Sequence, residues 1–100
     1  MRYFVIADED TVLGFSLVGT RGMTAANAGE ASDALRTALA NHEYGIIIIT
    51  QGIADMIRGE VDRFMFTETF PLIVEIPDRA SGYVSRDLKA LVNEAIGVTL

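Results

Sequence analysis

The chain has 100 residues, half of them apolar, which suffices for one small domain with a hydrophobic core. Its formal net charge of −6 argues against broad binding to nucleic acid or to an anionic membrane surface, because both need clustered cations. With no cysteine and one histidine, the chain cannot form disulfides, thiolate metal sites or histidine-rich metal sites.

The first third of the chain predicts a strand, a short helix and a weak second strand. Tyr3–Ala7 is apolar and rich in aromatic and β-branched residues, as in a strand buried on both faces. Three acids follow, and we expect Asp10 to cap a helix over residues 11–18. Gly19 stands where a left-handed residue would end that helix. Within residues 22–27 the sequence indicates only a short edge strand.

The middle of the chain carries the clearest patterns. From Glu30 onward, small and apolar residues recur on one helical stripe, which consists of Ala31, Ala34, Leu35, Ala38 and Leu39. Tyr44–Ile49 contains four consecutive isoleucines, and such a run predicts a strand of a parallel sheet with both faces covered. Thr50 ends that strand, and we expect its hydroxyl to cap the next helix.

The last part of the chain predicts two more helices and one more strand. One helix follows Thr50, with its apolar stripe at Ile53, Met56, Ile57, Val61 and Phe64. Pro71–Ile76 is an edge strand, because Pro71 lacks an amide donor and Glu75 interrupts the apolar run. A final amphipathic helix stops at Gly97 and has its stripe at Val84, Leu88, Leu91, Val92 and Ala95.

Alternating strands and helices imply right-handed crossovers and a parallel sheet. We therefore predict an α/β fold with four parallel strands in the order 2-1-3-4 and helices on both faces, similar to receiver and Rossmann folds. We expect residues 1–100 to form one domain, with the C-terminal helix and tail, about residues 83–100, packing on it or on a partner. The fully apolar runs, such as Tyr3–Ala7 and Ile46–Ile49, are far too short to span a membrane.

Ligands of such folds bind at the carboxyl edge of the sheet, where the winding reverses. The acids of Asp8–Asp10 could hold Mg²⁺ there beside Thr50–Gly52, or could serve as a helix cap and two solvated acids. A receiver would need an aspartate where Thr50 ends the strand, and the only lysine, Lys89, lies in the final helix. No Gly-x-Gly-x-x-Gly motif follows the first strand. We expect no catalytic set and no cofactor.

Apolar residues without an evident place in the core suggest a protein partner. Phe15 and Leu17 lie on different faces of a helix too short to bury both, and the tail after Gly97 has no place in the sheet. The candidate partner-binding residues are Phe15, Leu17, Ile96, Val98 and Leu100. A second apolar group, at Phe64, Met65, Phe66 and Phe70, either contacts a partner or folds over the core.

Three segments resemble the F subunit of the archaeal-type and vacuolar-type rotary ATPases. The first is Ile6–Gly19, with its Asp-Thr-x-x-Gly-Phe core at residues 10–15, and the second is Tyr44–Gln51. The third is Pro71–Pro77, followed near the terminus by Glu94–Val98. The order and spacing of the segments agree with the family, so the resemblance covers essentially the whole chain.

The resemblance implies a non-catalytic component of the central stalk, or rotor, of a V/A-type ATPase. Such a protein binds the coiled-coil D subunit, rotates inside the ring of A and B subunits, and couples or stimulates ATP hydrolysis or synthesis with H⁺ or Na⁺ transport. It is cytoplasmic and peripheral to the membrane, as part of the soluble sector, and the candidate residues above would form its face for the D subunit. The alternative is a degenerate receiver that binds Mg²⁺ or relays a conformational signal.

Overall fold

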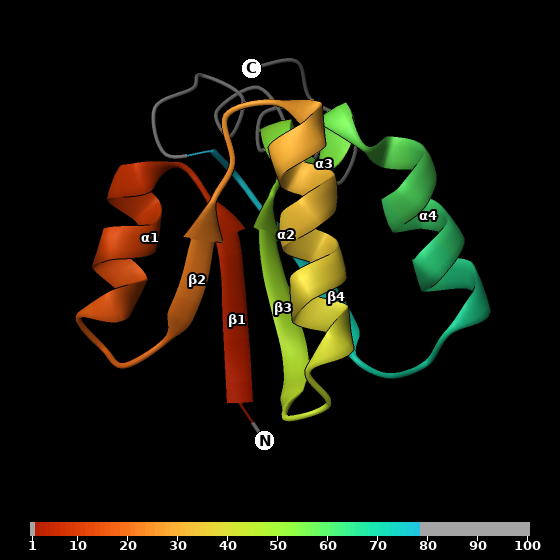
Figure 1. Cartoon of the computed structure of the whole chain (residues 1–100), viewed down its shortest axis with the longest axis horizontal. Coiled ribbons are helices and arrows are strands. Elements are labelled where there is room, and N and C mark those ends of the chain that lie inside the picture. The colour runs from red at the N-terminus through yellow and green to blue at the C-terminus, as the bar shows by residue number, and fades with distance from the viewer. Residues whose placement is uncertain (1, 79–100) are drawn as a thin grey trace, which may run out of the picture.

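Four parallel strands form one sheet in the order β2-β1-β3-β4, as the sequence predicts (Figure 1). The computed structural model describes residues 2–78, so the predicted final helix lies outside the described residues. The strands are β1 (Arg2–Ala7), β2 (Arg21–Thr24), β3 (Tyr44–Thr50) and β4 (Leu72–Ile76). The helices are α1 (Glu9–Ser16), α2 (Ala28–Ala40), α3 (Gln51–Met56) and α4 (Arg58–Thr67).

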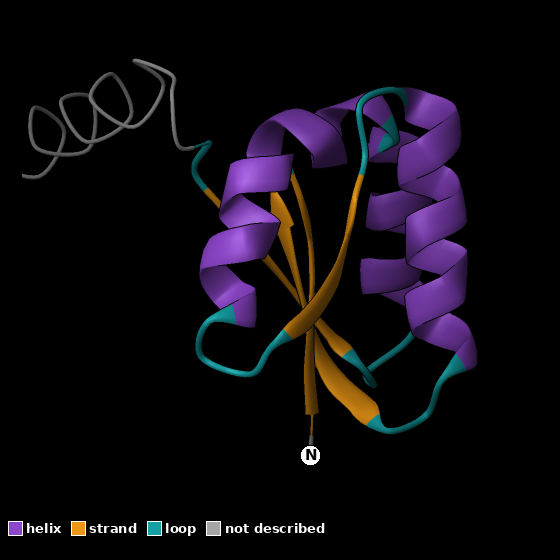
Figure 2. Cartoon of the chain, turned by 60° about the vertical axis from the view of Figure 1, so that its left-hand side comes forward, coloured by secondary structure: helices purple, strands orange, loops and turns teal. Residues whose placement is uncertain are grey.

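Helices cover both faces of the sheet, but unequally within residues 2–78. The chain moves across the sheet in one direction from β2 to β3 to β4, so right-handed crossovers place α2, α3 and α4 on one face. It moves in the opposite direction from β1 to β2, and α1 therefore lies alone on the other face (Figure 2).

The core fills the space between the sheet and α2, α3 and α4. Every second strand residue points into it, and these residues are Phe4, Ile6, Ile47, Ile49 and Ile73. The predicted stripe of α2 faces them, with Ala31, Ala34 and Ala38 fully buried and Leu39 packed at the margin. Because alanine side chains are small, α2 can lie close to the strands.

α2 begins before the predicted position because of two reciprocal hydrogen bonds at its start. The Asn27 side chain accepts from the Glu30 N–H at 2.9 Å, and the Glu30 carboxylate accepts from the Ala26 N–H at 2.8 Å. Both bonds satisfy amides that have no partner inside the helix. The stripe predicts the buried face of α2 correctly, but it does not predict that the helix begins at Ala28.

The prediction of a single helix after Thr50 is wrong in one respect. The structure has two helices there, α3 and α4, because the backbone leaves helical angles at Ile57 (φ −127°, ψ 37°). The break turns Ile57 and Val61 into the core, whereas Met56 is left half exposed. Gly59 lies inside α4 and does not cause the break.

The face of β3 and β4 beside α1 is only partly covered by residues 2–78. Strand register places one set of apolar side chains there: Tyr3, Ile46, Ile48, Leu72 and Val74. Tyr3 is 49% exposed and Leu72 56%, while Ile46 and Ile48 are half-buried. We call these five residues the open face.

Candidate functional site

The carboxyl edge of β1 is where acidic residues begin α1. Asp8 takes the N-cap position, and its carboxylate accepts from the Thr11 N–H at 3.1 Å and from the Thr11 hydroxyl at 2.5 Å. The prediction that Asp10 caps this helix is therefore wrong, because α1 begins two residues earlier and Asp10 lies in its first turn. A carboxylate in that turn still stabilises the helix through its dipole.

Removing the Asp8 cap is expected to destabilise the protein. Asp8→Ala leaves the first-turn amides of α1 without their acceptor, so the free energy of unfolding should fall by about 1 kcal/mol. Glu9→Ala, a neighbouring exposed acid in the same turn, should cost no more than about 0.5 kcal/mol. Urea denaturation of the two variants compares them directly, and equal losses would show that Asp8 acts through charge alone.

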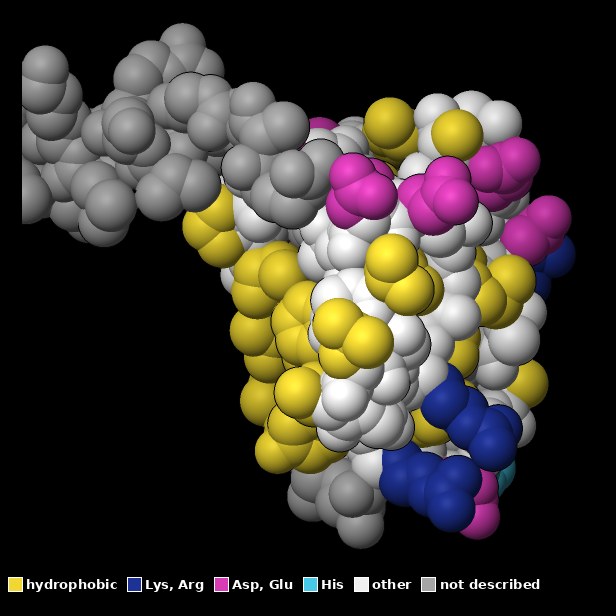
Figure 3. Space-filling model, turned by 90° about the vertical axis from the view of Figure 1, so that its left-hand side faces the viewer, with side chains coloured by type: hydrophobic (Ala, Val, Ile, Leu, Met, Phe, Trp, Pro, Cys, Tyr) yellow, Lys and Arg dark blue, Asp and Glu magenta, His cyan; other side chains and the backbone are white. Residues whose placement is uncertain are grey.

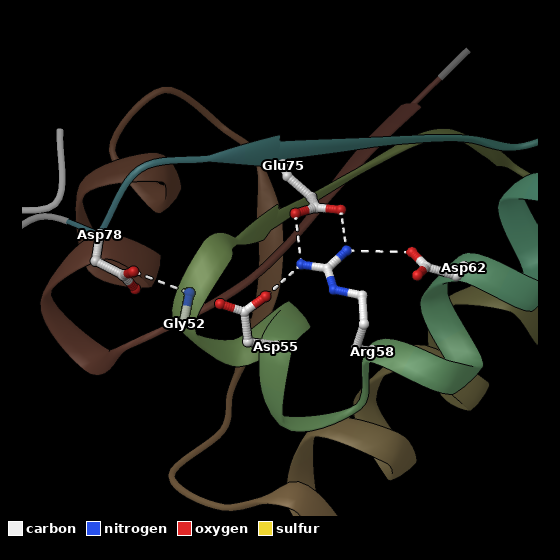
Figure 4. Close-up of polar contacts among 6 residues, drawn as sticks. All are labelled: Gly52, Asp55, Arg58, Asp62, Glu75 and Asp78. Atoms are coloured by element: carbon white, nitrogen blue, oxygen red, sulfur yellow. Dashed lines mark hydrogen bonds and ion pairs between the residues drawn. The ribbon is translucent and has the colours of Figure 1, made fainter. Parts of the chain in front are cut away.

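The carboxyl edge of β3 begins α3, and a distant residue supplies its acceptor. The carboxylate of Asp78 accepts from the Gly52 N–H at 2.9 Å (Figure 4). Thr50 holds the N-cap position as predicted, but its hydroxyl makes no capping bond, since the side chain is buried. Within residues 2–78, Thr50 Oγ1 and Gln51 Oε1 are the buried side-chain atoms without a hydrogen-bond partner.

The proposed Mg²⁺ site at this edge finds no support in the described part of the chain. No three acidic or histidine side chains among residues 2–78 are grouped so that they could hold a metal ion. Asp8 and Asp78 instead accept hydrogen bonds at the starts of two helices. Their arrangement favours the structural interpretation of the acids over the cation site of a receiver.

Arg58 is the centre of the strongest polar cluster in residues 2–78, and the sequence did not predict it. Its guanidinium bonds both carboxylate oxygens of Glu75 on β4, at 2.6 and 2.9 Å (Figure 4). The same group contacts Asp55 at 2.5 Å and Asp62 at 3.2 Å. One cation therefore joins the end of α3, the start of α4 and the edge strand β4.

This cluster is a structural clamp and has no arrangement for acid–base chemistry. The hydrogen bonds that the guanidinium donates to Glu75, and then to Asp55, raise the pKa of Arg58 above its ordinary value, so the guanidinium stays charged at every pH at which the protein folds. Glu75, which interrupts the apolar pattern of β4, is explained by this pairing. The sequence could not predict the pairing of Arg58 with Glu75, because the two residues lie 17 positions apart.

The predicted partner-binding residues of α1 lie on the surface to different degrees. Leu17 is 81% exposed and Val18, its neighbour, 78%. Phe15 is half-buried and lines a shallow groove of about 410 Å³ together with Val18 and Pro77. In Figure 3, hydrophobic side chains gather along this side of the molecule. Ile96, Val98 and Leu100 lie outside the described residues.

The second apolar group divides between the two alternatives left open by the sequence. Phe64 packs against the core, as a residue folded over it should. Phe66 and Phe70 are exposed, as is Met65. Phe70 joins Pro71 and His42 around a small hollow at the amino end of the strands.

Comparisons with known proteins agree with the resemblance noted in the sequence. Residues 4–94 match the family model described as ATP synthase (F/14-kDa) subunit. None of the helices in the described part of the chain is long and apolar enough to cross a membrane.

Proteins named as the F subunit of A-type ATP synthase are similar to this chain over nearly its whole length. The one from Methanosphaera stadtmanae is 33% identical and that from Methanothermobacter thermautotrophicus 35%, each alignment covering 96% of this chain and 92% of the relative. The one from Thermococcus gammatolerans is 33% identical, over 100% of this chain and 98% of the relative.

Proposed function

Because this chain belongs to the ATP synthase (F/14-kDa) subunit family, we propose that it is the rotor component that binds the coiled-coil D subunit in the central stalk. It is an accessory, non-catalytic subunit of an ATP synthase. In the proposed role it turns with the D subunit inside the ring of A and B subunits and couples ATP hydrolysis or synthesis to H⁺ or Na⁺ transport. Its place is cytoplasmic, in the soluble sector peripheral to the membrane.

One observation supports this role most: the apolar exposure at the end of α1. Leu17 and Val18 expose most of their side chains to water although both are aliphatic. Phe15 lies beside them in the shallow groove. Adjacent exposed apolar side chains favour a protein partner, and the apolar stripe of a coiled coil offers matching chemistry.

A polar substitution at Leu17 should weaken partner binding without affecting the fold. Leu17→Asp places a charge in the proposed interface, and the dissociation constant for the D subunit is expected to rise about 10-fold or more, which corresponds to about 1.4 kcal/mol. The midpoint of thermal unfolding should stay near that of the wild type, because Leu17 is exposed. Isothermal calorimetry with the purified D subunit measures the change.

Phe66→Asp is the matched control, since Phe66 is 89% exposed but lies on α4, on the opposite face of the sheet. It should leave binding unchanged. The strongest variant combines Phe15→Ala with deletion of residues 97–100. If this variant still co-purifies with the D subunit, α1 and the C-terminal segment do not form the interface.

A further inference from the structure

The amino edge of the sheet carries a hollow between the starts of β1 and β2. β1 runs two residues beyond β2 at this edge, since Arg21, the first residue of β2, pairs with Phe4. The step between the two strands is occupied by a hollow of about 470 Å³. Its lining comes from β1, the loop after α1, β2 and β3, and consists of Arg2, Tyr3, Gly19, Thr20, Arg21 and Tyr44. We call it the amino-edge hollow.

The folded sheet holds the walls of the amino-edge hollow in place. Tyr44 is only 5% exposed, and its ring packs on that of Phe4 with the centroids 4.8 Å apart. Gly19 has a φ of 85°, which lets the backbone turn from α1 into β2. Tyr3, on the other side, also belongs to the open face. The shape of the hollow is therefore set by the ends of three strands and one tight turn.

The amino-edge hollow gathers positive charge in an acidic chain. The net charge is −6, yet two of the eight Lys and Arg residues line this one hollow, and none of its lining residues is acidic. Arg2 lies 3.7 Å from the Glu43 carboxylate, but both side chains are more than half exposed, so water screens the pair. Arg21 has no ion pair with another residue of 2–78. The charge of the hollow is thus suited to an anionic group from outside.

The apolar neighbours of the hollow indicate what kind of anion it takes. Leu17 and Val18, both largely exposed, immediately precede Gly19 in the same loop. In Figure 3, basic side chains lie next to hydrophobic ones toward the lower end of the view. A free phosphate ion makes no use of aliphatic side chains, whereas a protein partner buries them. A coiled-coil helix presents both chemistries, because charged residues flank its apolar seam.

We propose that the amino-edge hollow receives an acidic side chain from the flank of a partner coiled coil, whose apolar seam packs on Leu17 and Val18. The inference rests on the proposed function, under which the partner is the D subunit. Guanidinium groups bind carboxylates through paired N–H donors, so Arg2 and Arg21 hold the acid in a defined position. Because the hollow is open to water, its charge acts mainly on the rate of association and on the register of the partner helix.

Association rates of the full-length chain with the purified D subunit test this assignment. Arg21→Glu is expected to lower the association rate constant about 10-fold at about 0.05 M salt, and the difference should shrink to about 2-fold at about 1 M salt, where charges are screened. Arg63→Glu is the matched control, since Arg63 is also exposed and without an ion pair in residues 2–78 but lies on α4. It makes the same change in net charge and should alter the rate by no more than about 2-fold.

A rescue experiment identifies the acidic partner group. In the presence of Arg21→Glu, acidic residues of the D subunit are replaced by lysine one at a time, and one replacement should restore the rate by at least about 5-fold. Arg21 is exposed, so the midpoint of thermal unfolding should stay near that of the wild type. If Arg21→Glu does not fold, Arg21→Gln replaces it; this variant removes only the charge and should lower the rate about 3-fold.

The outcomes separate this inference from the proposed function. Equal association rates for the Arg21→Glu and Arg63→Glu variants overturn the hollow as the docking point but leave binding to the D subunit intact. A wild-type chain that does not bind the D subunit at any salt concentration overturns the proposed function, and the partner named here with it. Inorganic phosphate, titrated at constant ionic strength, should not saturate the amide shift of Arg21 below about 10 mM. Saturation below about 1 mM that Arg21→Gln abolishes would show a site for a small anion and overturn the proposal.

Discussion

Replacing Gly22 with alanine is expected to lower the free energy of unfolding by about 2–3 kcal/mol. Gly22 lies on β2 under α1, and an added Cβ would come within 2.5 Å of Val5 Cγ1 and 2.6 Å of the Val5 carbonyl oxygen. It would also lie 3.3 Å from Val12 Cγ1 on α1. The carbonyl belongs to the central strand β1, so the backbone cannot yield cheaply, and α1 or β2 must move instead.

Thermal unfolding followed by circular dichroism should record a fall in the midpoint of about 10–20 °C. Gly14→Ala is the matched control, because Gly14 lies inside α1 and no atom is within 4 Å of its added Cβ. Alanine favours a helix interior over glycine, so this variant should be up to about 1 kcal/mol more stable. Gly22→Ala with wild-type stability would show that α1 does not pack this closely on β2.

Replacing Arg58 with methionine is the second large effect that we expect. The variant keeps the length of the side chain but leaves Asp55, Asp62 and Glu75 around a site without a cation. The resulting repulsion and the lost hydrogen bonds both destabilise the fold. Because the Arg58 side chain is 37% exposed, water screens part of the effect, and the expected loss is about 1–2 kcal/mol.

Arg63→Met makes the same change on the same helix, at an exposed residue, and should stay within about 0.5 kcal/mol of the wild type. Adding Glu75→Gln to Arg58→Met should recover part of the loss, because it removes the carboxylate that faces the guanidinium most directly. Urea denaturation measures all three variants. A loss that is the same at Arg58 and Arg63 would contradict a clamp centred on Arg58.

The sheet could be predicted because burial alone determines it. Four consecutive isoleucines indicate a strand inside a parallel sheet, and the alanine-rich stripe indicates the helix beside it. The strand order and both edge strands are therefore confirmed. Residues 2–78 leave Ile46 and Ile48 half-buried, and a run of isoleucines does not say which part of the chain covers them.

Polar contacts between distant residues could not be predicted. Asp78 bonds Gly52 and Glu75 bonds Arg58 only because β4 lies beside the helices that precede it, and no spacing in the sequence marks either pair. The cap of α1 is different, because Asp8 and Asp10 are both suitable residues near the same start. The choice between them depends on the residue at which β1 ends. The break between α3 and α4 at Ile57 likewise has no glycine or proline to mark it.

The pairing of β1 with β3 has a consequence for how the protein folds. β1 lies in the interior of the sheet, yet one of its two neighbours follows only after β2 and α2. During synthesis the first strand therefore emerges well before the partner that completes its hydrogen bonding. Closing so long a loop costs chain entropy before any contact repays it, which slows folding in proteins rich in non-local pairs. The hydrogen bonding of β1 is thus complete only after β3 has been synthesised and has paired with it.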